Sequence, residues 1–233
     1  MDPTPPPKRP RPGPPPPSGT ALWQAAWQDQ KIKPFQEAHD GKSASFYPKT
    51  FIDLPNFNFN ILIRKEYPES ARELERQGLA LSGIEAERRF IVTGQPGIGE
   101  CKGIQGHRAP LKSRLALGKT VFLIYLLIER LSRKQPTAVQ LYDPRRYPLF
   151  DEEGVRELSS DDASPLSPEV WALTDSNDEV IKPCTAFTKS DALVLLASSP
   201  RSPRWKEWKK QNYARLFVMD LWSESELHML LLV

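Results

Sequence analysis

The chain has 233 residues, of which 39% are hydrophobic and 26% charged, with a formal net charge of +3. This composition is typical of a globular protein with one substantial core, and so small a net charge favours neither a nucleic-acid nor a membrane surface. The two cysteines and three histidines show no ligand spacing, so they predict neither a metal site nor a disulfide framework. The first residues lack the apolar stretch of a signal peptide, and no apolar run approaches the ~20 residues that span a bilayer. We therefore expect an intracellular protein, cytoplasmic or nuclear.

Residues 1–19 are a proline-rich segment, since ten of the 24 prolines lie in the first twenty positions. Proline lacks the N–H donor and the φ freedom that a packed core uses, so we predict a disordered or polyproline II tail. This tail contains a small basic cluster, Lys8, Arg9 and Arg11. Three positive charges among prolines are more typical of a solubilising tail than of a targeting signal. A nuclear-localisation signal is the alternative.

Residues 20–87 form a preface to the main domain. A short helix is predicted from Thr20, as N-cap, to about Gln30, with tryptophans on one face that either pack on the domain or bind a partner. An apolar segment follows near residues 59–63. A second helix is predicted to open at Pro68 and to close at Gly78.

Residues 88–233 alternate apolar strands with helical stretches, and "GKTVFLIYLLIERLSRK" is apolar almost all round, as in a buried helix. Between the second and third strands, the acidic, turn-rich residues 143–168 indicate a surface insertion with a hairpin. We therefore predict an α/β fold, a mostly parallel doubly wound sheet of the P-loop NTPase kind. The expected strands are 88–94, 137–142, 169–175, 192–199 and 214–220.

The carboxyl end carries a helix-start signal. Ser223 and Glu226 have capping-box spacing, in which each side chain satisfies a backbone donor of the other. The sequence stops at Val233 with that helix newly begun, so we expect a domain cut short.

A split motif carries the chemistry. A phosphate-binding loop needs G-x-x-x-x-G-K-[ST] between a strand and a helix, because backbone N–H groups must wrap the phosphate at the helix start. "FIVTGQPGIG" supplies the strand and glycines, and "GKTVFLIYLLIERL" the rest. Gly94, Gly97 and Gly99 would wrap phosphate, Lys119 would neutralise it, and Thr120 would bind Mg²⁺.

Residues 100–118 interrupt this motif, and their removal restores it without a residue missing or spare. Taken literally, the eight residues ending at Thr120 are "SRLALGKT", with Ser113 where the first glycine belongs. Gly99-Glu100-Cys101 can be encoded GGT GAG TGC, which contains a splice-donor-like GTGAGT, and Leu117-Gly118 can supply an acceptor-like TAG. We hypothesise an unspliced intron translated in frame. The alternative is a genuine loop, and the codons at the two boundaries decide between them.

Asp175 is the second candidate for the metal. It ends an apolar strand with one strand expected between it and the phosphate-loop strand, where an acidic residue holds Mg²⁺ through water. The alternative is a residue of the turn "DSND". Many P-loop ATPases place a water-activating Glu next, whereas this chain has Ser176, which argues against fast hydrolysis. Ser198 and Ser199 either sense the γ-phosphate or simply end the fourth strand.

From about Phe59 onward the chain resembles a family of fungal P-loop proteins related to retrotransposon hot spot and Crinkler proteins. The similar stretches, in order, are "ILIRKEYPE", "TGQPGIG" joined to "GKTVFLIYLLIERL", "VWALTDSN", "ASSPRSPRWKEWKKQ" and "VMDLWSESEL". The resemblance implies an ATPase-like domain that uses Mg-ATP, with variable C-terminal regions.

The sequence thus predicts an ATP-binding, P-loop NTPase-like protein with catalytic Lys119 and Asp175, impaired in this chain by the split loop. The competing prediction is a non-catalytic interaction or regulatory protein, or a defective gene product, that binds no nucleotide. A nucleotide is the expected partner, while nucleic acid and membrane are not, and the protein partner is left open.

Overall fold

The computed structural model describes residues 17–33, 45–47, 52, 54, 61–80, 88–94, 118–162, 164–199, 204–220, 223 and 226. The predicted tail before Pro17 and the predicted helix after Glu226 lie outside these ranges.

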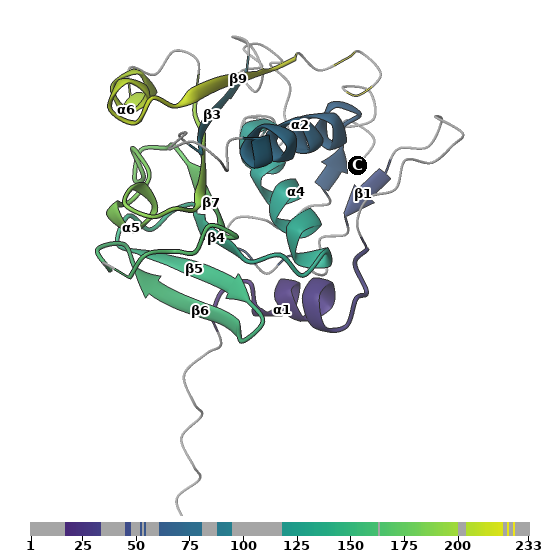
Figure 1. Cartoon of the computed structure of the whole chain (residues 1–233). Coiled ribbons are helices and arrows are strands. Elements are labelled where there is room, and N and C mark those ends of the chain that lie inside the picture. The colour runs from purple at the N-terminus through teal and green to yellow at the C-terminus, as the bar shows by residue number, and fades with distance from the viewer. Residues whose placement is uncertain are drawn as a thin grey trace, which may run out of the picture.

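A seven-stranded sheet organises the described part of the chain (Figure 1). Along the sheet the strands lie in the order β6-β5-β4-β7-β8-β3-β9. Neighbours from β4 to β9 are parallel, whereas β5 and β6 form an antiparallel hairpin on β4. The strands span Arg89–Gly94 (β3), Thr137–Gln140 (β4), Arg146–Asp151 (β5), Gly154–Ser159 (β6), Trp171–Asp175 (β7), Leu193–Ala197 (β8) and Arg215–Met219 (β9).

The five predicted strands and the predicted hairpin are therefore confirmed, as is an α/β fold with a mostly parallel sheet. Short apolar runs were a sufficient signal because helices cover both faces of a parallel sheet, so its inner strands are buried on both sides. β8 is the clearest case, since every residue of Leu193–Ala197 is buried.

Helices lie on both faces of this sheet (Figure 1). One face carries α4 (Gly118–Ser132), and beyond it α2 (Glu66–Ala80) and the N-terminal helix made of α1 (Thr20–Trp23) and the π-helical η1 (Gln24–Gln28). The small antiparallel pair of β1 (Ser45–Tyr47) and β2 (Ile61–Ile63) lies on the same side. The other face carries α5 (Thr185–Thr188) and α6 (Arg204–Asn212).

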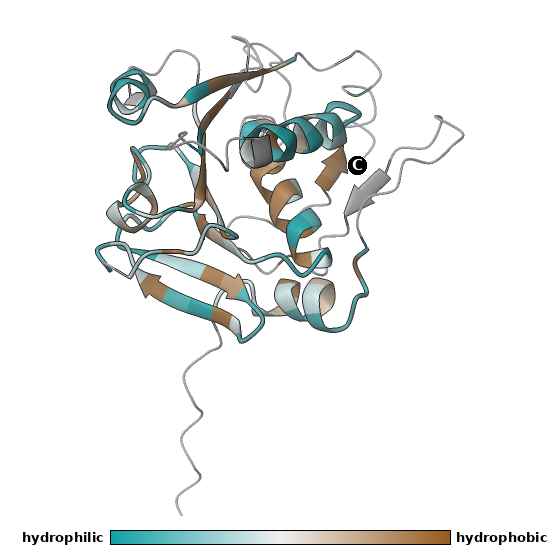
Figure 2. Ribbon diagram, in the orientation of Figure 1, coloured by the Kyte–Doolittle hydropathy of each residue, from teal (hydrophilic) through white to brown (hydrophobic). Residues whose placement is uncertain are grey.

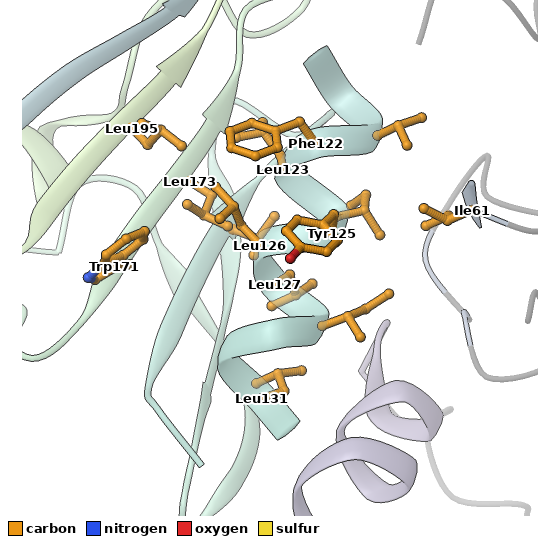
Figure 3. Packing of buried hydrophobic residues seen from close by; sticks show 14 of the residues in the cluster. Ile61, Phe122, Leu123, Tyr125, Leu126, Leu127, Leu131, Trp171, Leu173 and Leu195 are labelled. Atoms are coloured by element: carbon orange, nitrogen blue, oxygen red, sulfur yellow. The ribbon is translucent and has the colours of Figure 1, made fainter. Parts of the chain in front are cut away.

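The helix α4 is the centre of the larger hydrophobic core. Residues 121–128 are all buried, and in Figure 2 this helix is hydrophobic along most of its length while α2 is largely hydrophilic. Figure 3 shows why an all-apolar helix is stable here, since it lies between Leu173 and Leu195 of the sheet and Ile61 on its far side. Each fully buried Leu or Ile contributes roughly 1.5–3 kcal/mol relative to exposure.

A second core fills the other face of the sheet. Strand alternation divides the side chains between the two faces, so that Leu195 packs with α4 whereas Leu196 packs with the second cluster. Trp208 of α6 is buried in this second cluster and Trp205 packs against it.

Three local predictions about helix ends were wrong. Pro68 does not open α2, which begins two residues earlier at Glu66. Thr20 is the first residue of α1 rather than its N-cap, which is Gly19; the Thr20 hydroxyl donates to the Pro17 carbonyl oxygen over 2.6 Å. Gly78 does not close α2, which continues to Ala80. An ideal Cβ on Gly78 would lie 2.5 Å from Leu193 Cδ1, so this glycine allows the helix to approach β8.

The capping box at the carboxyl end is confirmed. The Ser223 N–H donates to Glu226 Oε2 over 2.8 Å, and the Glu226 N–H donates to Ser223 Oγ over 3.3 Å. Glu226 also contacts Arg64, with 3.3 Å between Nε and Oε1. This arginine, 2% exposed, joins the start of α2 to the end of the described chain.

Candidate functional site

The candidate site lies where the parallel strands end and α4 begins. Gly94 is the buried last residue of β3, Asp175 is the last residue of β7, and Lys119 and Thr120 occupy the first turn of α4. β8 pairs with both β3 and β7 and therefore lies between them, as the sequence predicted for Asp175. In open α/β sheets this carboxyl edge is where ligands bind.

Thr120 and Asp175, 55 positions apart in sequence, meet at this edge. The Thr120 hydroxyl donates to Asp175 Oδ2 over 2.9 Å. Thr120 is buried and Asp175 is partly buried. The fold thus joins two residues that the sequence proposed as ligands of the same metal ion.

The Asp175 carboxyl is electrostatically unusual. Burial raises its pKa to about 6, and this effect outweighs the lowering effects of the Thr120 hydrogen bond, the nearby Lys119 charge and Asn177. Burial removes the water that would stabilise the ionised carboxylate. A cation bound beside it would compensate for that lost hydration and favour the ionised form. Lys119 is the cation whose charge lowers the pKa of this carboxyl.

Asn177 positions the end of β7, a role that sequence reasoning missed. Its Nδ2 donates to the carbonyl oxygens of Leu141 and Asp175, over 2.5 and 3.2 Å. Its Oδ1 accepts the N–H groups of Glu179 and Val180. The signal was present in "DSND", because Asn caps turns of this kind, but its partner in the neighbouring strand end cannot be read from a local pattern.

Three hydroxyls lie below the same edge on the opposite face of the sheet. Thr93, Thr174 and Ser198 are at most 4% exposed, and their side-chain oxygens have no hydrogen-bond partner among the residues that the structure describes. Strand alternation places them on the side of α6, whereas Asp175 and Thr120 meet on the side of α4. The Ser198 side chain, proposed from sequence as a γ-phosphate sensor, is thus buried and unsatisfied, and Ser199 accepts a hydrogen bond from Trp205 at its carbonyl oxygen.

The middle of the split motif lies outside the described residues. The structure describes the chain up to Gly94 and again from Gly118. Gly97, Gly99 and nearly all of the 100–118 insert therefore lie outside the described residues. The structure therefore brings together Lys119, Thr120 and Asp175, while Gly94 ends the strand that leads to the loop.

No family model, curated protein or solved structure matches the chain. Over the described ranges, no helix has both the length and the apolar character needed to cross a membrane.

Proposed function

We propose that this chain binds a magnesium nucleoside triphosphate at the carboxyl edge of its sheet, as an ATPase-like protein. The observation that carries the proposal is the hydrogen bond between Thr120 at the start of α4 and Asp175 at the end of β7. A Ser or Thr after the loop lysine and an acidic residue one strand away are the two protein groups that hold Mg²⁺ in such sites. Their contact is what the split motif predicts once its halves are joined.

The residues present fit the ion. The Thr120 hydroxyl and the Asp175 carboxylate are hard oxygen donors, and Mg²⁺ usually keeps several waters and takes one or two protein ligands plus substrate phosphates. Lys119 would neutralise the phosphate charge from the same helical turn, and the start of α4 would present its positive dipole end to the phosphates. The bound ion would shield the transferring phosphate.

Hydrolysis in this proposal is slow. Ser176 follows Asp175, and its hydroxyl donates to the Ile181 carbonyl oxygen over 3.0 Å. A serine so placed does not supply the carboxylate that would take a proton from an attacking water. The proposed activity is therefore nucleotide binding with weak turnover.

Calorimetric titration of Mg-ATP into the full chain tests the proposal. Lys119→Ala is expected to weaken binding at least tenfold because it removes a phosphate contact, and Asp175→Asn is expected to abolish the dependence on Mg²⁺. Lys182→Ala, at an exposed position, is the matched control and should leave affinity unchanged.

The chain lacking residues 100–118 separates the fold from the insert. If it binds Mg-ATP and the full chain does not, the insert is what impairs the site. Binding by neither, with both folded, would contradict the proposed function.

A further inference from the structure

A concave surface lies at the amino ends of β4 and β7, away from the candidate nucleotide site. It is a groove of about 660 Å³ between the β5–β6 hairpin and residues 164–170. Its apolar lining includes Leu149, Leu158 and Leu166. Its carboxylates, which give it the name acidic groove used below, are Asp151, Glu152, Glu153, Asp162 and Glu169.

The acidic groove opposes the charge of the chain, whose net charge is +3. Two cations, Lys134 and Arg156, also line it, but Arg156 is engaged by two of the carboxylates, Asp151 and, at 3.2 Å, Glu153. The three remaining carboxylates, Glu152, Asp162 and Glu169, are exposed and face one lysine. Hydrogen bonds from Ser164 lower the pKa of Asp162, which keeps it ionised at neutral pH.

A ligand that complements this groove would carry positive charges for the carboxylates and apolar side chains for the leucines. The chain carries such a segment at residues 5–12, "PPPKRPRP", and no Asp or Glu occurs between Asp2 and Asp29. Proline fixes φ in advance, so an extended proline segment loses little entropy on binding. Charge and composition thus both complement the groove.

The tail also leaves the described chain beside the groove. Gly19 packs on Phe150, since an ideal Cβ there would lie 2.6 Å from its ring. The Trp23 indole N–H donates to the Asp151 carbonyl oxygen over 2.8 Å, and Trp27 lines the groove itself. Pro17 follows Arg11 by six positions, and at about 3.1 Å per residue this segment can extend roughly 19 Å. A tether this short gives an effective concentration in the millimolar range.

We propose that the acidic groove binds the chain's own residues 5–12, with Lys8, Arg9 and Arg11 against its carboxylates and the prolines against its apolar lining. This contact is independent of the proposed nucleotide site, which lies at the other end of the strands. It makes the tail a ligand of the domain.

Zero-length carbodiimide cross-linking of the full chain tests this contact, because Lys8 is the single lysine among residues 1–16. Peptide mapping of the monomeric product is expected to place Lys8 on Glu152, Asp162 or Glu169 at several times the yield on Glu179 and Glu207, exposed carboxylates elsewhere. Salt on the order of 0.5 M should remove the preference, since it screens exposed charges within a few Å.

The double variant Arg9→Ala/Arg11→Ala is expected to reduce the Lys8 links several-fold with an unchanged melting temperature. Equal yields at all exposed carboxylates would overturn the proposal. So would Lys8 links found in cross-linked dimers alone, because they would mean that the tail binds a second copy.

Discussion

Two opposed effects act on the Asp175 carboxyl. Burial favours its neutral form, whereas a cation at this position would favour its ionised form. Its neighbours, Thr120 and Lys119, lower its pKa, yet burial still raises the value from 3.8 to about 6. A metal ion bound there would remove the penalty, because it pairs with the charge that burial disfavours. Asp175 thus destabilises the metal-free fold at neutral pH, and under the proposed function a bound Mg²⁺ would offset that cost.

A pH-dependent stability follows from this shift. Between about pH 4 and pH 6 the unfolded chain releases the Asp175 proton while the folded chain keeps it, so the free energy of unfolding falls as pH rises. Asp175→Asn lacks this pH-dependent loss, so its free energy of unfolding relative to the wild type should rise by roughly 2 kcal/mol between pH 4.5 and 7.5. Urea unfolding followed by tryptophan fluorescence measures the difference.

The control for this series is Asp191→Asn, at an exposed carboxylate before β8. It should show no such gain. A difference between wild type and Asp175→Asn that is the same at both pH values would show that Asp175 is already ionised throughout.

Single residues also mark how far the sequence could predict the site. Thr120 was identifiable because the split motif fixes its position at the start of a helix, and Asp175 because it ends an apolar strand expected one strand away. Asn177 was not, since its role depends on the Leu141 carbonyl in a neighbouring strand. The burial of Ser198 was equally hidden, because a serine before a proline has the pattern of an ordinary strand end.

At the scale of elements, α2 packs closely against β8 because Gly78 has no side chain. Gly78→Ala would improve the intrinsic helix propensity by about 1 kcal/mol, but its Cβ would meet Leu193 at 2.5 Å in a fully buried contact. We expect a net loss of about 1–2 kcal/mol from overpacking.

A double-mutant cycle isolates this contact. In a Leu193→Ala background the obstructing Cδ1 is gone, so Gly78→Ala should become neutral or stabilising when unfolding by urea is measured. An equal effect in both backgrounds would mean that Leu193 does not set the packing of α2.

Among the elements, the sequence predicted those that have a local signal, either a hydrophobic periodicity or a capping motif. The five strands, α4 and the Ser223–Glu226 box fall in this class. The error at Gly78 has a clear cause, because a glycine near the end of a helical pattern is the usual stop signal and only the neighbouring strand shows that it serves packing. The π-helical turn of η1 had no sequence signal that we can identify.

Across the whole molecule, Arg64 joins the start of α2 to the end of the described chain. It lies 3.3 Å from Glu226 and 3.2 Å from Glu66, and its guanidinium is 5.7 Å from the Tyr67 ring centroid. Glu226→Ala should cost about 3 kcal/mol, because it leaves a buried cation with fewer partners. Chemical unfolding gives the value.

Glu73→Ala is the matched control, since its ion pair with Arg76 lies on the surface. Exposed ion pairs contribute little to stability, so its unfolding midpoint should not move measurably. A Glu226→Ala midpoint equal to that of this control would mean that the carboxyl end is not coupled to α2.

The order of strands also has a consequence during synthesis. β3 is flanked by β8 and β9, whose first residues are Leu193 and Arg215, whereas β3 itself ends at Gly94. A ribosome must therefore add roughly 100 residues after β3 before either neighbour exists, which takes about 5–20 s at ordinary elongation rates. During that interval the apolar strand "FIV" has both hydrogen-bonding edges free, so the nascent chain depends on chaperones or on early packing of α4 to avoid aggregation.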